Sequence, residues 1–185
     1  METIIFVDTE TGGTNPDKHS LLSVGLVAWD RTNGIIDKRE VFLKSDTYSF
    51  TQKAVEINKF DRAEHDAIAV PHDYAVNMIR DFCVKNTGAN KDIQIAGHNI
   101  QFDVAFLKKL FKEQNRSFSS LFSHRMIDTF SILKYLNDAG KISINPLSSA
   151  NAFKLFDIKV KKRHSALGDA VATAQLYEAL IKLIE

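Results

Sequence analysis

The first quarter of the chain consists of short apolar runs separated by turn-forming residues. Residues 3–8 form a β-branched and aromatic run that stops at a carboxylate, which predicts a buried strand. After a loop rich in Gly, Asn and Pro, residues 21–30 and 35–43 predict two further strands. Asn33 and Gly34 between them form a typical two-residue hairpin turn. The chain is therefore expected to begin with a sheet built around a hairpin.

From Thr51 onward the apolar residues recur with helical spacing, interrupted by a strand-length run at residues 93–96. Helices are expected on a face that includes Tyr74, after Asp103, after Asp128 and over residues 148–156. A last helix is expected over residues 166–184, with Ser165 as its N-terminal cap. A hairpin followed by alternating strands and helices predicts an α/β three-layer fold with a mixed central sheet, and a helix-rich α+β fold is the alternative. Since no repeat or linker interrupts the pattern, residues 1–185 are expected to form a single domain.

Composition narrows the class of protein. The chain has 185 residues, of which 44% are hydrophobic and 25% charged, as in an ordinary globular protein. No apolar run approaches the ~18 residues of a membrane span, and no secretory signal is visible, so we expect a cytoplasmic protein with no membrane partner. The single cysteine excludes an internal disulfide framework. A formal charge of +1 means that any contact with nucleic acid must be local.

Four carboxylates fall at the ends of predicted elements. Asp8 and Glu10 are two residues apart, so strand geometry places both side chains on one face. Asp103 and Asp169 lie near the starts of predicted helices. Each acid taken alone has an ordinary explanation, either a solvated strand end or a carboxylate favoured by a helix dipole.

The acids gain meaning as a set, because the ends of elements in an α/β domain converge on one rim of the sheet. Four carboxylates in one pocket are typical of two divalent cations ~3.5–4 Å apart. Oxygen ligands without cysteine favour Mg²⁺ or Mn²⁺. His164 lies five residues before Asp169 and has the near-neutral pKa range suited to a base for an attacking water.

Three ordered motifs contain these acids and His164. The first is FVDTETGG at residues 6–13, the second is HNIQFD at residues 98–103, and the third is HSALGDA at residues 164–170. An Ile-Asp-Thr element lies at residues 127–129. Together these motifs resemble those of the DEDDh 3′–5′ exonucleases. The resemblance spans essentially the whole chain and is nearest to the proofreading exonuclease subunit of bacterial replicative polymerases, the epsilon subunit of DNA polymerase III.

This resemblance implies a ribonuclease H-like fold and the release of nucleoside 5′-monophosphates from a 3′ end with two Mg²⁺ or Mn²⁺ ions. By position, Asp8, Glu10 and Asp169 would bind the first metal directly, with Asp8 bridging. Asp103 would support the second metal, largely through water, and His164 would be the general base. The positions implied to contact substrate are Thr9, Thr11, Ile57, Asn58 and Asn99.

Three further stretches of sequence depart from the motifs or add candidate substrate contacts. Residues 57–60 read INKF where relatives often read Val-His-Gly-Ile or Val-Asn-Gly-Ile, so Lys59 replaces a glycine. A basic cluster immediately before His164 is the best candidate phosphate-binding patch, although a solvated loop explains it equally well: Lys159, Lys161, Lys162 and Arg163. A weaker candidate lies on the helix after Asp103: Lys108, Lys109 and Lys112.

Three functions remain open on the sequence. The leading one is a metal-dependent 3′–5′ exonuclease acting on a nucleic acid 3′ end, with DNA ahead of RNA and a polymerase as a candidate partner. The second is a ribonuclease that trims small RNAs or oligonucleotides, since sequence does not show whether a 2′-hydroxyl is recognised. The third is a non-catalytic nucleic-acid-binding module, which would be expected to have lost at least one of the five catalytic residues.

Overall fold

The computed structural model describes residues 2–58, 60–145, 147–160 and 165–185, apart from the side chains of residues 57 and 58. Within these segments five strands form one sheet: β1 (Ile4–Thr11), β2 (Leu21–Asp30), β3 (Gly34–Phe42), β4 (Ile93–Gly97) and β5 (Phe122–Asp128). The helices are α1 (Gln52–Asn58), α2 (Arg62–Ile68), α3 (His72–Thr87), α4 (Gln101–Glu113), α5 (Thr129–Asp138), α6 (Ser149–Leu155) and α7 (Ala166–Ile184), with a 3₁₀ turn at Phe118–Ser120.

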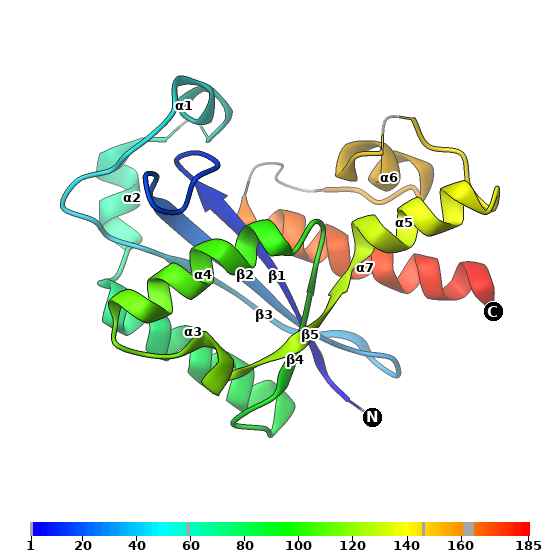
Figure 1. The fold of residues 1–185 in the computed structure, drawn as a ribbon, viewed down its shortest axis with the longest axis horizontal. Coiled ribbons are helices and arrows are strands. Elements are labelled where there is room, and N and C mark those ends of the chain that lie inside the picture. Colours follow the sequence, from blue (N-terminus) through cyan, green and yellow to red (C-terminus); the bar gives the residue numbers. More distant parts are fainter. Residues whose placement is uncertain (1, 59, 146, 161–164) are drawn as a thin grey trace.

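The sheet is mixed, with the strand order β3-β2-β1-β4-β5. The first three strands are antiparallel neighbours, whereas β4 runs parallel to both β1 and β5. Helices α3 and α4 cover one face of the sheet and α7 covers the other (Figure 1). This is the expected α/β three-layer architecture with the ribonuclease H-like fold, and it places the middle strand β1 between two layers of helices.

Strand β1 is buried on both faces, and its alternation decides which layer each residue meets. Ile5 and Val7 pack into the core under α3 and α4, whereas Ile4 and Phe6 pack with small residues of α7. Because successive side chains of a strand point to opposite faces, the polar residues that follow along β1 are divided between the same two layers.

Several element predictions are confirmed and others are wrong. Strand β2 has the predicted bounds, and the predicted hairpin between β2 and β3 is confirmed, with Gly34 in the left-handed region at φ +70°. The turn differs from the predicted Asn33-Gly34 pair, because residues 31–33 form the connection and Gly34 already pairs with Asp30 in the sheet. Strand β1 extends to Thr11, so Asp8 and Glu10 lie within it and not beyond its end. Tyr74 is 62% exposed and does not belong to the buried face of α3.

Strand β5 was missed by the sequence pattern. Three consecutive residues in its first half are polar: Ser123, His124 and Arg125. Such residues are tolerated there because β5 is the last strand of the sheet and pairs on one side only. An edge strand in water carries a weak apolar signal. Among the described helices, none is long and apolar enough to cross a lipid bilayer.

Candidate active site

The acids of β1 face helix α7. Asp8 and Glu10 continue the side of the strand that carries Phe6, while Thr9 lies on the opposite side. Asp8 pairs in register with Gly25 of β2. A Cβ atom on Gly25 would lie 2.2 Å from the carbonyl carbon of Ala166, so only glycine lets the start of α7 approach the sheet here.

The start of α7 is fixed by its cap. The hydroxyl of Ser165 accepts a hydrogen bond of 3.1 Å from the backbone N–H of Gly168, as predicted from the sequence. Asp169 therefore lies in the first turn of a helix whose N-terminus is pressed against Gly25, the neighbour of Asp8. A strand and a helix separated by more than 150 positions are thus joined at one point.

Three carboxylates meet where β1 faces α7. One oxygen atom from each of Asp8, Glu10 and Asp169 lies within 4.8 Å of the others. Burial, then the charges of Asp103 and Asp169, raise the pKa of Asp8 well above its ordinary value. Burial and then Asp169 raise the pKa of Glu10 to about 7. The fold therefore brings together three acids predicted from the sequence, although burial and their mutual repulsion disfavour their charged forms.

Asp103 lies beside this trio but is not one of the three clustered residues. It belongs to the first turn of α4 and is only 4% exposed. Its Oδ1 accepts a hydrogen bond of 2.7 Å from the hydroxyl of Thr9. Burial raises the pKa of Asp103 to about 7, and the bond from Thr9 opposes that rise. Thr9 was expected to touch substrate, yet its hydroxyl is directed to Asp103.

Glu40 is an acidic neighbour that the motifs do not include. It pairs with Gly25 across β2 and β3, in the same cross-sheet row as Asp8, and accepts a hydrogen bond from the Ser23 hydroxyl. Its charge raises the pKa of both Asp8 and Glu10. The hairpin turn alone would not have revealed this row, because pairing counted from Asp30 and Gly34 places Arg39 beside Gly25. The register shift between Ala28 and Trp29 moves Glu40 into that position.

The second motif is held by the end of β5. The Asp128 carboxylate accepts a hydrogen bond of 2.7 Å from the backbone N–H of Asn99, which has φ +59°, and also caps α5. Thr129 donates to the Gly97 carbonyl and contacts a ring nitrogen of His98 at 3.1 Å. The Ile-Asp-Thr element therefore holds the strand-to-helix turn that leads to Asp103.

A hollow opens beside Glu10 on the side of α1. Its volume is about 340 Å³, and it is lined by Thr9, Glu10, Thr11, Gly13, Thr14, Thr51, Lys53, Ala54 and Phe102. The hydroxyl of Thr11 donates to the Gly13 carbonyl. Phe102 packs on Phe106, with ring centroids 5.3 Å apart, and also borders this hollow. Phe102 thus packs against the core and also forms part of the wall of this hollow.

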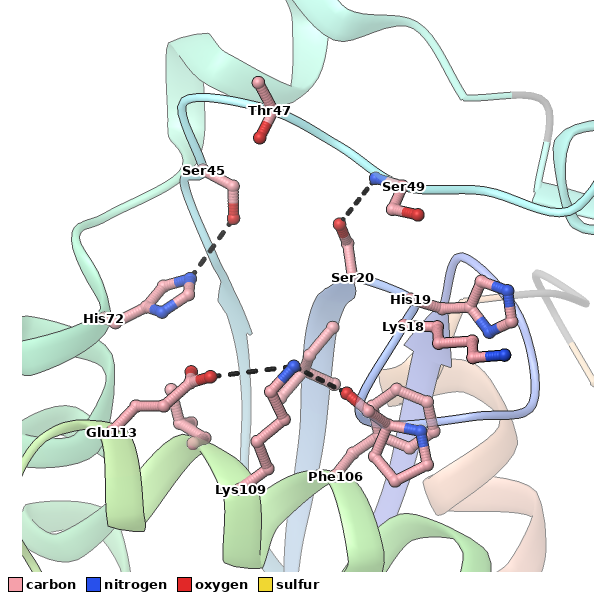
Figure 2. Close-up of a pocket in the computed structure, with 13 residues that line it drawn as sticks. Lys18, His19, Ser20, Ser45, Thr47, Ser49, His72, Phe106, Lys109 and Glu113 are labelled. Atoms are coloured by element: carbon pink, nitrogen blue, oxygen red, sulfur yellow. Dashed lines mark hydrogen bonds and ion pairs between the residues drawn. The ribbon is translucent and has the colours of Figure 1, made fainter.

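Helix α4 contacts the loop that contributes Gly13 and Thr14 to the wall of that hollow. Lys109 donates a hydrogen bond of 2.6 Å to the Pro16 carbonyl and lies 3.6 Å from the Glu113 carboxylate (Figure 2). Ser20 accepts a hydrogen bond from the Ser49 backbone. These contacts surround a second cavity of about 200 Å³. Lys109 thus holds the loop that follows Thr11 against α4.

Some sequence-predicted residues lie outside the described part of the structure. His164, Lys161, Lys162, Arg163 and Lys59 belong to this group. The backbone of α1 includes Ile57 and Asn58, but their side chains are not described. Their assigned roles therefore stay predictions.

The donor set fits hard divalent cations. The trio offers only carboxylate oxygens, which Mg²⁺ and Mn²⁺ prefer. Among the described residues, every charged group that shifts the pKa of Asp8 or Glu10 is itself an acid. A cation between the acids would relieve this repulsion, and the protein supplies none there from the part that is described.

Curated relatives share part of their length with this chain. The 3′–5′ exonuclease DinG of Staphylococcus epidermidis is 27% identical over 191 residues, which cover 100% of this chain and 18% of DinG. DinG of Staphylococcus aureus strain USA300 is 27% identical over 183 residues, covering 95% of this chain. The chain spans 18% of the length of these relatives.

Solved structures share the fold. The zinc-bound Escherichia coli exonuclease I complex with single-stranded DNA has a TM-score of 0.85 at 18% identity, covering 98% of this chain and 41% of that one. Exonuclease I with a dT13 oligonucleotide has a TM-score of 0.81 at 18% identity, covering 96% and 40%. At this identity the likeness establishes the architecture.

A family profile covers nearly the whole chain. The profile of the RNase_T family, described as Exonuclease, matches residues 5–177. That range contains all four acids of the site and both flanking layers of the sheet. The chain belongs to the RNase_T family and is an exonuclease domain.

Proposed function

We propose that this exonuclease domain hydrolyses the terminal phosphodiester bond at the 3′ end of single-stranded DNA and releases nucleoside 5′-monophosphates. The observation that carries the proposal is the meeting of three carboxylates within 4.8 Å, from one strand and one helix, with raised pKa values in the two on the strand. Such an arrangement is unstable without cations and suits the handling of a phosphate.

The acids would hold two Mg²⁺ or Mn²⁺ ions. Asp8, Glu10 and Asp169 are the proposed ligands of the first ion, and Asp103 is the proposed support of the second, because its charge acts on Asp8 from the adjacent layer. When bound, the ions would supply an activated water and neutralise charge on the phosphate. His164 is the proposed base that removes the proton from this water.

The hollow beside Glu10 is the proposed seat of the terminal nucleotide. It adjoins the acid cluster, and its wall offers the Phe102 ring and the polar groups of Thr11 and Thr51. Thr9 would act through its main chain, because its hydroxyl already donates to Asp103. Asn99, Ile57 and Asn58 stay predicted substrate contacts; the Asn99 side chain is exposed in its turn.

The preference for DNA is part of the proposal. Its support is the similarity to DinG, named a 3′–5′ exonuclease, and to exonuclease I structures with single-stranded DNA. Trimming of small RNAs is the second candidate, because the hollow beside Glu10 has room for a ribose. Its lining includes the polar groups of Thr11 and Thr51, which are compatible with a 2′-hydroxyl. Digestion of DNA and RNA oligonucleotides of matched sequence separates the two.

The deciding experiment follows single strands labelled at either end, with Mg²⁺, Mn²⁺ or EDTA. We expect stepwise shortening from the 3′ end in either metal, 5′-monophosphate products, and no reaction in EDTA. Asp8→Asn should abolish the reaction, whereas the matched control Asp138→Asn, on the exposed side of α5, should not. Cleavage of circular single strands, or full activity of Asp8→Asn, would contradict the proposal.

Four broader expectations stay predictions. We propose that residues 1–185 form a single exonuclease domain, supported by a family match that begins at residue 5 and ends at residue 177. The cytoplasmic location and the polymerase partner expected from the sequence also stay predictions, as does the particular likeness to the epsilon subunit.

A further inference from the structure

The last turns of α4 carry a row of cations on their exposed side. Lys108 and Lys112 are four residues apart and therefore neighbours on the helix surface. The chain then turns at Asn115, with φ +55°, and the backbone N–H of Arg116 bonds to the Phe111 carbonyl. Arg116 is thereby held beside the end of the same helix. We call Lys108, Lys112 and Arg116 the basic row.

The basic row borders an open hollow of about 640 Å³. The hollow is lined by Lys108, Lys112, Asn115, Arg116, Ser117, Phe118 and Ser119, with no acid among these residues. The hydroxyls of Ser117 and Ser119 lie 2.8 Å apart at its edge and can act as donors. The Lys108 ammonium lies 5.9 Å from the centre of the Phe118 ring. The surface offers cations, hydroxyls and an amide, which are the groups that contact phosphate oxygens.

Several other cations on the surface are neutralised by acidic partners, whereas the three of the basic row are not. Lys109 is paired with Glu113, Lys85 with Asp37 and Lys182 with Glu178. Within the described segments, no member of the basic row takes part in an ion pair. In a chain whose formal charge is only +1, an uncompensated run of three cations is a local feature with a local field.

The basic row is connected to the acid site by α4 itself. Asp103 lies in the first turn of this helix, and Lys112 is nine residues later, about 13 Å further along the axis at 1.5 Å per residue. On the solvent side, Gln101 and Lys108 are exposed and Ala105 between them is half-buried. This side is a surface path, without a bulky side chain at its middle, from the turn that holds Asn99 to the basic row.

We propose that the basic row binds the phosphodiester backbone of the single strand whose 3′ end lies in the acid site, a few nucleotides upstream of the bond that is cut. The inference rests on the proposed function and adds a second anchoring point to it. Phosphates of a flexible strand are bound by point charges without regard to sequence. The two sites together would favour substrates long enough to reach from the acids to the far end of α4.

The test compares long and short substrates with one triple variant, Lys108→Gln/Lys112→Gln/Arg116→Gln. Binding of a long fluorescent oligothymidylate is measured by anisotropy in EDTA, and hydrolysis of that strand and of a dinucleotide is measured in Mg²⁺. We expect the variant to bind the long strand about tenfold more weakly, with a log–log salt slope lower by about two. Its kcat/KM should fall for the long strand and stay unchanged for the dinucleotide.

The matched control removes three cations that are already paired: Lys85→Gln/Lys134→Gln/Lys182→Gln. It changes the net charge equally and should leave the binding and the salt slope of the long strand close to wild type. If both triple variants weaken binding alike, or neither does, the basic row is not the anchoring site. A protein that binds the long strand through the basic row but never hydrolyses DNA would contradict the proposed function and leave this inference standing.

Discussion

Each end of α4 lies in a cluster of like charges, but the acids at its start are buried and the lysines toward its end are exposed. At its first turn Asp103 is 4% exposed, its pKa is raised to about 7 by burial, and its charge adds to the burden on Asp8. Over its last two turns Lys108 and Lys112 lie in water, where repulsion between neighbouring charges is weak. The buried acids are therefore stabilised by cations bound within the fold, whereas the exposed basic row attracts an anionic ligand from solution.

The difference shows how the burial of a charge limits what it can do. Buried carboxylates are fixed in place by hydrogen bonds such as that from Thr9, which is what the positioning of ions and a reacting phosphate requires. Exposed lysines retain their rotamer freedom and can follow a moving strand, at little cost to the fold. One helix thus connects a rigid site to an adaptable surface, and each end can be perturbed separately.

The largest expected effect comes from the acidic end, with Asp103→Asn. The amide is the same size and its oxygen can still accept the bond from Thr9, so the fold should persist. Turnover should fall by about 10²–10³-fold, because the variant loses charge that the metal site needs. In EDTA the free energy of unfolding should rise by about 1 kcal/mol, because a charge that repels Asp8 is removed.

Steady-state kinetics and urea unfolding of wild type and Asp103→Asn measure both effects. The exposed Asp157→Asn is a suitable control. An Asp103→Asn protein that is less stable than wild type in EDTA would show that the carboxylate is a structural partner of Thr9 before it is a member of the acid cluster.

A medium effect is expected from pH and metal. Burial raises the folded-state pKa values of Glu10 and Asp103 to about 7, above those of the unfolded chain, and for Glu10 the neighbouring acids add to this rise. The folded state therefore holds more protons, and metal-free stability should be greatest below the unfolded pKa values and fall as pH rises toward 7 and above. The loss should be on the order of 2 kcal/mol, since Glu10 is partly solvated and the groups are coupled.

Thermal unfolding between about pH 5 and pH 8, with EDTA or with Mg²⁺, checks the sign. Mg²⁺ should restore stability at the upper end of this range, because it replaces the proton as the counterion. Glu10→Gln/Asp103→Asn should flatten the profile in EDTA. A metal-free stability that rises steadily from pH 5 to pH 8 would mean that the acids are ionised without strain.

The smallest effect distinguishes two lysines that lie three positions apart in the second half of α4. Lys112→Gln should weaken the binding of a long single strand about two- to threefold and lower the log–log salt slope by about 0.7, the share of one phosphate. Lys109→Gln should leave the slope unchanged, because this side chain is directed to Pro16 and Glu113. Salt titrations of both variants in EDTA give the two slopes. Equal slopes would contradict the distinction between Lys109, which is bonded within the protein, and the basic row.

The sequence by itself determined the framework and the chemistry. The runs at residues 3–8 and 21–30, the hairpin turn at Gly34 and the cap at Ser165 are local signals, because turn and cap geometry depends on a few adjacent residues. The motifs likewise identified the acids, and the two-residue period correctly placed Asp8 and Glu10 on one face. The strand β5 escaped because edge strands need not alternate.

Only the tertiary structure decided which groups meet and at what cost. The close approach of α7 over Gly25 brings Asp169 to Asp8, and the register of β2 and β3 adds Glu40 to the same row. It also separated Lys109 from Lys112, candidates only three positions apart in the sequence but with different surroundings. Burial and pairing depend on elements far apart along the chain, so no local pattern encodes the raised pKa of an acid or the uncompensated charge of a lysine.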